Sequence, residues 1–194
     1  MTRPGEPHDG SGQDRLEIVL GPERLARDLL RAGGMSVEQL TTYLNDHVGG
    51  SVAALELLDH LSEAHAGTPS ERLFKELRAD IEQDQGQLKE LLRRLGGEES
   101  SVTKAAGWLG EKLGRGKMWL DDEKNGDFRL VESLELLALG IQGKMSLWRT
   151  LAAVAERLPA LAGVDFASLQ RRAREQQDRV EMRRLEAART AFTS

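Results

Sequence analysis

The chain has 194 residues, a net charge of −5 and no cysteine; 30% of its residues are charged and only 4% are aromatic. Without cysteine, disulfides, thiolate metal sites and thiol nucleophiles are excluded. The acidic balance argues against nucleic acid or an anionic membrane as a partner, and no apolar run approaches the roughly 18 residues of a membrane span. The first residues lack the apolar core of a signal peptide, so we expect a cytoplasmic protein.

The N-terminal residues differ in composition from the rest of the chain. Residues 1–15 are rich in Gly, Pro, Asp and Ser without periodicity, which predicts a disordered tail. Residues 16–35 predict an N-terminal arm with a short helix, which follows Pro22 and ends at Gly33-Gly34. Apolar residues then recur at helical spacing, so we expect a four-helix bundle over residues 36–194.

Four long helices are predicted in this bundle, because apolar residues stand three and four positions apart along one face of each. The third helix is typical, with Leu134, Ile141 and Trp148 on one stripe. The composition, rich in helix formers and poor in strand formers, also favours an all-α fold. The expected helices cover about residues 36–66, 70–95, 128–158 and 165–192.

Connection lengths predict how these helices are joined. The first and second helices, and likewise the third and fourth, are separated by only a few residues, so each pair forms an antiparallel hairpin. Residues 98–128 are long enough to return the chain to the starting end of the bundle, as one long crossover connection does in ferritin-like bundles. We expect Trp108 and Trp119, together with Trp148, to bury this crossover against the bundle.

Five segments carry a resemblance to known proteins: YLNDHVGGSVAALELLDHL, LRADIEQDQGQLKELLRRLG, AAGWLGEKLGRGK, LVESLELLALGIQGKMSLWRTL and REQQDRVEMRRLEAAR. With these segments the chain resembles the ferritin-like superfamily, and more closely an uncharacterised bacterial family of ferritin-like four-helix-bundle proteins. The resemblance covers about residues 38–192. It implies an all-α bundle with one long crossover, and it implies no particular activity.

The two-metal site of this superfamily is not expected here. Members that hold two metals use one glutamate from each of two helices and a Glu-x-x-His pair from each of the other two. Glu82-x-x-Gln85 and Glu175-x-x-Asp178 occupy comparable places but lack the imidazole. All the histidines fall in the tail or on the first helix: His8, His47, His60 and His65.

A smaller polar set remains on the inner faces of the predicted helices. His47 lies on the apolar face of the first helix, where a buried polar side chain needs a partner. Asp84 lies on the apolar stripe of the second helix, and Lys144 borders that of the third. Counting along the helices places these residues near one level. We therefore predict one buried polar layer made of His47, Ser51, Asp84, Gln176 and Gln177.

The layer allows four interpretations at this point. It is a hydrogen-bonded network that fixes the register of the bundle, or a site for a single iron, manganese or zinc ion at His47 and Asp84, although two good ligands are few for tight binding. Alternatively, it is a ligand pocket, or an Asp–His pair for acid–base catalysis without an evident nucleophile or cleft. The sequence therefore leaves open whether the chain is an enzyme.

The leading functional hypothesis is a non-catalytic, ferritin-like helical protein that acts through self-association or a protein partner and that has lost the usual two-metal site. The alternative is a metal-binding stress or storage protein, with an atypical site for iron or manganese around His47 and Asp84. The leading hypothesis requires no cofactor.

Glycines inside the predicted helices need an explanation of their own. Each glycine inside a helix destabilises it by about 1 kcal/mol relative to alanine, and the predicted helices contain Gly49, Gly50, Gly86, Gly140 and Gly143. We expect the close approach of another helix to compensate for this loss, either inside the monomer or at a dimer interface.

Overall fold

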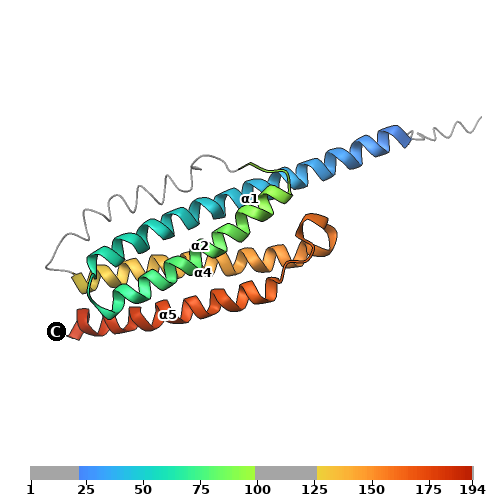
Figure 1. The fold of residues 1–194 in the computed structure, drawn as a ribbon. Coiled ribbons are helices and arrows are strands. Elements are labelled where there is room, and N and C mark those ends of the chain that lie inside the picture. Colours follow the sequence, from blue (N-terminus) through green and yellow to red (C-terminus); the bar gives the residue numbers. More distant parts are fainter. Residues whose placement is uncertain (1–21, 99–125, 194) are drawn as a thin grey trace, which may run out of the picture. The chain divides into compact units, whose positions relative to one another are not determined.

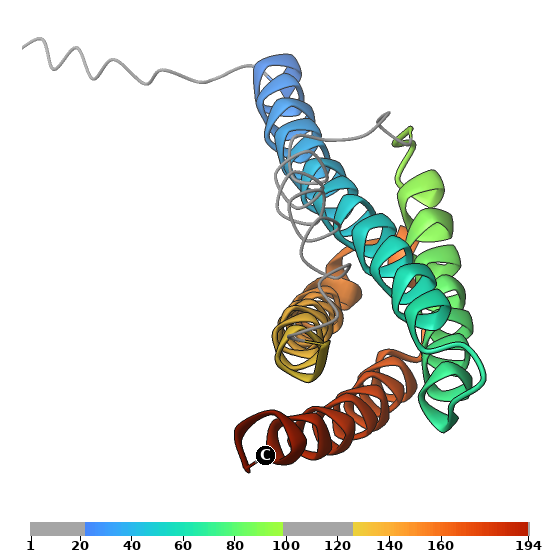
Figure 2. The same cartoon turned by 90° about the vertical axis from the view of Figure 1, so that its left-hand side faces the viewer.

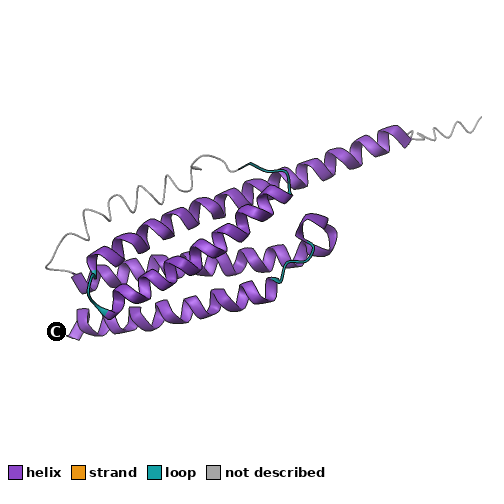
Figure 3. Ribbon diagram, viewed as in Figure 1, coloured by secondary structure: helices purple, strands orange, loops and turns teal. Residues whose placement is uncertain are grey.

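The computed structural model of the chain describes residues 22–98 and 126–193, and the described side chains begin at residue 37. All the secondary structure in these ranges is helical (Figure 3). The chain divides into two units, Met1–Ser36 and Val37–Ser194, and the bundle lies in the second. Its long helices are α1 (Pro22–Ala64), α2 (Pro69–Arg94), α4 (Gly126–Val154) and α5 (Phe166–Thr193).

Most helix ends lie close to the positions that the sequence predicts. Three glycines at the ends of these elements have left-handed φ angles. They are Gly67 after α1 (79°), Gly96 after α2 (73°) and Gly163 before α5 (75°). Such left-handed backbone is readily adopted by glycine, and it ends a helix. Between α4 and α5 the chain forms two short 3₁₀ turns, Ala155–Arg157 and Pro159–Leu161. The third predicted helix therefore ends earlier than expected, at Val154.

The predicted break at Gly33-Gly34 is wrong, because α1 is continuous from Pro22 to Ala64. Pro22 is its first residue, a place where proline is tolerated because the first N–H groups of a helix have no partner in the helix. A glycine pair lowers helix stability by only about 1 kcal/mol per residue. It therefore ends a helix only where the backbone also turns.

The four helices pack as two antiparallel hairpins (Figures 1 and 2). α1 and α2 are joined by a short turn and are linked at Ser51–Gln85. α4 and α5 are linked at Arg184–Glu135. α5 is also antiparallel to α2, because Ser70 near the start of α2 contacts Arg183 near the end of α5. α2 and α4 therefore run in the same direction.

The core follows the predicted apolar stripes. Leu134 and Trp148 on α4 have no exposed surface, and Ile141 is 2% exposed, which confirms the stripe expected for the third helix. Equivalent stripes of the other helices meet them in one cluster. No helix in the described ranges is long and apolar enough to cross a membrane. Two predicted features cannot be followed in the described residues. The tail lies wholly outside them, and so does nearly all of the crossover, with Trp108 and Trp119.

Candidate functional site

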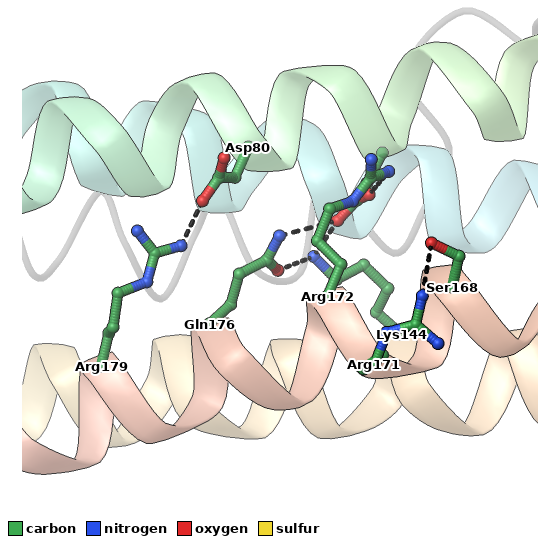
Figure 4. A network of polar contacts seen from close by, with 8 residues as sticks. Asp80, Lys144, Ser168, Arg171, Arg172, Gln176 and Arg179 are labelled. Atoms are coloured by element: carbon green, nitrogen blue, oxygen red, sulfur yellow. Dashed lines mark hydrogen bonds and ion pairs between the residues drawn. The ribbon is translucent and has the colours of Figure 1, made fainter.

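A buried carboxylate lies at the centre of the bundle. Asp84 of α2 is 2% exposed, and its oxygens are bound by side chains from two other helices. Lys144 of α4 donates to Oδ2 at 2.6 Å, and Gln176 of α5 donates to the same oxygen at 3.1 Å. Arg172 of α5 forms an ion pair with Oδ1. The Lys144 ammonium also donates to Gln176 Oε1, so α2, α4 and α5 meet in one network (Figure 4).

Helical spacing explains why these side chains meet. Arg172, Gln176 and Arg179 stand four and three positions apart, so they share one face of α5. Asp80 and Asp84 stand four apart and share one face of α2. Because the two helices are antiparallel, Arg172 reaches Asp84 while Arg179 reaches Asp80 (Figure 4). The two acids of α2 thus oppose two arginines of α5.

The environment of Lys144 is both desolvated and charged. Burial lowers the pKa of its ammonium, and the neighbouring Asp84 carboxylate opposes this shift. Removing one partner of such a buried pair is strongly destabilising, because it leaves an uncompensated charge in the interior. The network therefore joins three helices in one arrangement and disfavours any shift in their register.

The structure divides the polar layer that the sequence predicts. Asp84 and Gln176 are in direct contact. Ser51 belongs to a separate pair, in which its hydroxyl donates to the Val48 carbonyl at 2.6 Å and accepts from Gln85 Nε2 at 2.9 Å. Gln177 Oε1 is buried and has no hydrogen-bond partner among the described residues.

His47 lies beside this network and has different neighbours. Its ring is half-buried and meets the ring of Tyr43 edge to face, with the ring centroids 4.8 Å apart. Burial lowers the pKa of the imidazole, and the carboxylate of Asp46 opposes the shift. Asp84 instead bonds with Lys144 and Arg172, so the described contacts do not pair it with His47.

The other two described histidines, His60 of α1 and His65 of the turn after it, are half-buried. His65 is half-buried, and its ring lies 5.6 Å from that of Phe74, centroid to centroid. Burial is the main reason for the lowered pKa of His65. His60 Nε2 is buried without a hydrogen-bond partner in the described ranges. The turn after α1 therefore packs against α2 through the rings of His65 and Phe74.

A cavity of about 200 Å³ adjoins the network between α1, α2 and α4. It is lined by Gly50, Gly140 and Gly143, and a Cβ atom built on any of the three meets no atom within 4 Å. The same holds for Gly86 on α2. Among the described residues, no helix approaches closely at Gly50, Gly86, Gly140 or Gly143, and a close approach by the crossover or by a second subunit stays a prediction.

The arginines of α5 are the part of the site that the sequence interpretation missed. Arg172 and Arg179 belong to a charged segment that is typical of a solvated helix face. The usable signal was their spacing from Gln176, which places all three on one face of α5 opposite Asp80 and Asp84. Long cationic side chains bury their stems along such a face while the charged ends find partners.

The oxygens of Asp84 point at nitrogen donors rather than at another carboxylate or imidazole. Among the residues that the structure describes, no group of three or more His, Asp or Glu side chains has the arrangement of a metal site. The known proteins add no further constraint, because no family model, curated protein or solved structure matches the chain.

Proposed function

We propose that this protein is a non-catalytic helical bundle that acts through protein contacts, and that its main contact is with a second copy of itself. The observation that carries the proposal is a row of exposed apolar side chains on α4 and α5. Large apolar side chains scattered singly over a surface need no explanation, but a contiguous row marks an interaction surface. We call this row the α4–α5 strip; its members are Phe128, Leu139, Leu185 and Phe192.

One ring contact and the helical spacing relate the four members of the strip. The rings of Phe128 and Phe192 meet at 6.1 Å between centroids, which links the start of α4 to the end of α5. Leu185 stands seven positions before Phe192 and so shares its face of α5. Leu139 stands eleven positions after Phe128 and shares its face of α4. Leu139 and Phe192 are 69% and 64% exposed, so much of their apolar surface is free to bind.

Charged residues around the strip favour contact with an identical surface. Arg184 pairs with Glu135 of α4 at 3.1 Å and with Glu181 of α5 at 2.7 Å. The strip is thus flanked by charges of both signs, as at the polar rim of a typical interface. A two-fold dimer places the same patch on both sides, so each copy can offer its arginine to the other's glutamates.

Ferritin-like topology and cytoplasmic residence are part of the same proposal. The parallel run of α2 and α4 supports the topology, because the chain between them has to return along the bundle. The metal-binding alternative at His47 and Asp84 has weaker support. Both oxygens of Asp84 are engaged by the cations Lys144 and Arg172, so a metal ion there has to displace two ion pairs.

Sedimentation velocity of the untagged protein tests the proposal. We expect a dimer at micromolar concentration, and we expect the double variant Leu139→Glu/Phe192→Glu to sediment as the 21.5 kDa monomer. Val52→Glu is the matched control, since Val52 is an exposed apolar residue on α1, outside the strip. A wild-type monomer at 100 µM, or stoichiometric iron that is lost in His47→Ala, contradicts the proposal.

A further inference from the structure

The cavity between α1, α2 and α4 has the size of a small-molecule site. Its volume of about 200 Å³ exceeds the roughly 150 Å³ of an engineered cavity that binds benzene, and it is smaller than the typical pocket for a drug-sized ligand. Asp46 of α1 and Gly140 of α4 line it and are both exposed, so the cavity opens to the surface between these helices. A single-ring molecule fits this space and has a way in.

Most polar side chains of the wall bind one another. Lys144 donates to Asp84 at 2.6 Å, Gln85 donates to Ser51 at 2.9 Å, and all four of these residues line the cavity. Trp148 also lines it but has no exposed surface, so its indole N–H offers no hydrogen bond to a molecule inside. The hydrogen bonds of the wall are therefore made within the protein.

The remaining two polar residues of the wall add no buried charge. Burial lowers the pKa of the His47 imidazole, although the Asp46 carboxylate opposes the shift, so this ring is uncharged at pH 7. Asp46 is exposed, and water screens its charge. An ion inside the cavity loses its hydration, while Asp84 and Lys144 are already engaged with each other. The wall therefore favours a neutral molecule.

Apolar side chains and glycines form the rest of the wall. Ile81 and Ile141 are 3% and 2% exposed and line the cavity from α2 and α4. Three helical glycines also line it, and a Cβ atom added to any of them meets no atom within 4 Å: Gly50, Gly140 and Gly143. Larger residues at these positions fill the space, so the glycines keep it open. An apolar occupant is favourable here, because it removes apolar surface from water.

We propose that this cavity binds a small neutral molecule with an apolar, ring-sized body, held by apolar contact and not by an ionic bond. The molecule lies against Ile81 and Ile141, beside the glycines of α1 and α4. No member of the α4–α5 strip lines the cavity, so this site is independent of the proposed dimer. A monomeric protein can still bind the ligand, and a dimer can lack it.

Two of the three isoleucines of the chain line the cavity, and this makes the site directly observable. The probe is benzene, added to protein with ¹³C-labelled isoleucine methyl groups. We expect the methyl signals of Ile81 and Ile141, assigned through Ile81→Val and Ile141→Val, to shift and to saturate as benzene is added. The reason is that an aromatic ring in van der Waals contact changes the local magnetic field. Wild-type signals that do not move show that another part of the chain or a second copy fills the space, and they overturn the proposal.

Charged ligands of similar size test whether the site is neutral. We expect benzoate and benzylammonium each to bind about tenfold more weakly than benzene, since either ion loses hydration and meets no free partner among the described residues inside the cavity. Benzoate that binds as tightly as benzene contradicts the proposal. Tighter binding of benzylammonium, lost in Asp46→Asn, assigns the site to a cation and overturns it as well.

Cavity-filling variants complete the test. Gly140→Leu should abolish the benzene shifts while circular dichroism shows an intact helical fold, and Gly50→Leu fills the space from α1 if the first variant does not fold. Gly86→Leu is the matched control, because Gly86 also lies inside a helix with free space around it but does not line the cavity. It should bind benzene as the wild type does. Unchanged benzene binding in folded Gly140→Leu and Gly50→Leu places the ligand elsewhere and overturns the proposal.

Discussion

Asp84 receives donors from two neighbouring helices, and these hold a carboxylate that is only 2% exposed. Its counterpart Lys144 has an aliphatic stem and a charged end. Burial lowers the pKa of this ammonium, and Asp84 opposes the shift. A buried pair of this kind matters for stability chiefly because losing one partner leaves an uncompensated charge in the interior. The two residues should therefore behave as one unit under mutation.

We predict strong coupling between Asp84 and Lys144. Lys144→Met should lower the free energy of unfolding by about 3 kcal/mol, because Asp84 then lacks one of its two cationic partners. Asp84→Leu/Lys144→Met should be less destabilising than the sum of the single variants by about 1–3 kcal/mol. Urea denaturation of the four proteins measures this difference.

The surface pair Asp59–Arg78 is the control for this cycle. This pair joins α1 to α2 at the bundle surface, and its side chains are 52% and 33% exposed. Its coupling should stay below about 1 kcal/mol, since solvent screens exposed pairs. Additive effects at Asp84 and Lys144 contradict a direct interaction between them.

At the scale of the helices, periodicity predicted the buried faces and missed the open space between them. Leu134, Ile141 and Trp148 were assigned to the core because apolar residues at this spacing have to face it, and they do. Asp84 was placed inside for the same reason, since it lies on the stripe of Leu77 and Leu88. A cavity leaves no such periodic signal, because it depends on how far apart two packed helices lie.

The partners of Asp84 were harder to predict than its burial. Lys144 was placed at the border of the third helix, while Arg172 looks like one more cation on a charged segment. Which cation reaches a buried acid depends on the register of two antiparallel helices that are far apart in the sequence. Local spacing restricts the choice to one face of α5, and only the packed structure selects among the residues of that face.

The helical glycines give a prediction at this scale. Gly140→Ala should stabilise the protein by about 0.5–1 kcal/mol, because the new methyl group meets no atom within 4 Å and alanine favours the helix. Thermal denaturation followed by circular dichroism at 222 nm measures the gain.

Gly97 provides the contrasting substitution. A Cβ atom there lies 2.7 Å from Leu92 Cδ1 and 2.9 Å from Thr41 Cγ2, and Leu92 is itself buried. Gly97→Ala should therefore lower the melting temperature. If Gly140→Ala also lowers it, the space beside α4 is smaller than described.

At the scale of the whole molecule, the half-buried histidines His47 and His65 link stability to pH. Burial lowers the pKa of His47 and of His65 below the ordinary value of 6.5 that the unfolded chain keeps. Below pH 6.5 the unfolded chain therefore binds more protons than the folded protein. Stability should fall as the pH decreases from 6.5 through the two lowered pKa values.

Urea midpoints between pH 8 and pH 5 check this dependence. His47→Gln should flatten the decrease below pH 6.5, and His47→Gln/His65→Gln should flatten it further. Between pH 7.5 and pH 8 the curves of all three proteins should run parallel, since both histidines are then neutral in either state. A wild-type midpoint that stays constant down to pH 5 contradicts the link.

The position of the Lys144 ammonium has a consequence for how the bundle depends on its surroundings. A free ion occupies its site according to its concentration, so a fold that needs the ion follows mass action. Lys144 is part of the chain, and it meets the oxygens of Asp84 and Gln176 in a one-to-one ratio in every folded molecule. The centre of this bundle therefore keeps its cation when metal ions are chelated or scarce, and when the protein is diluted.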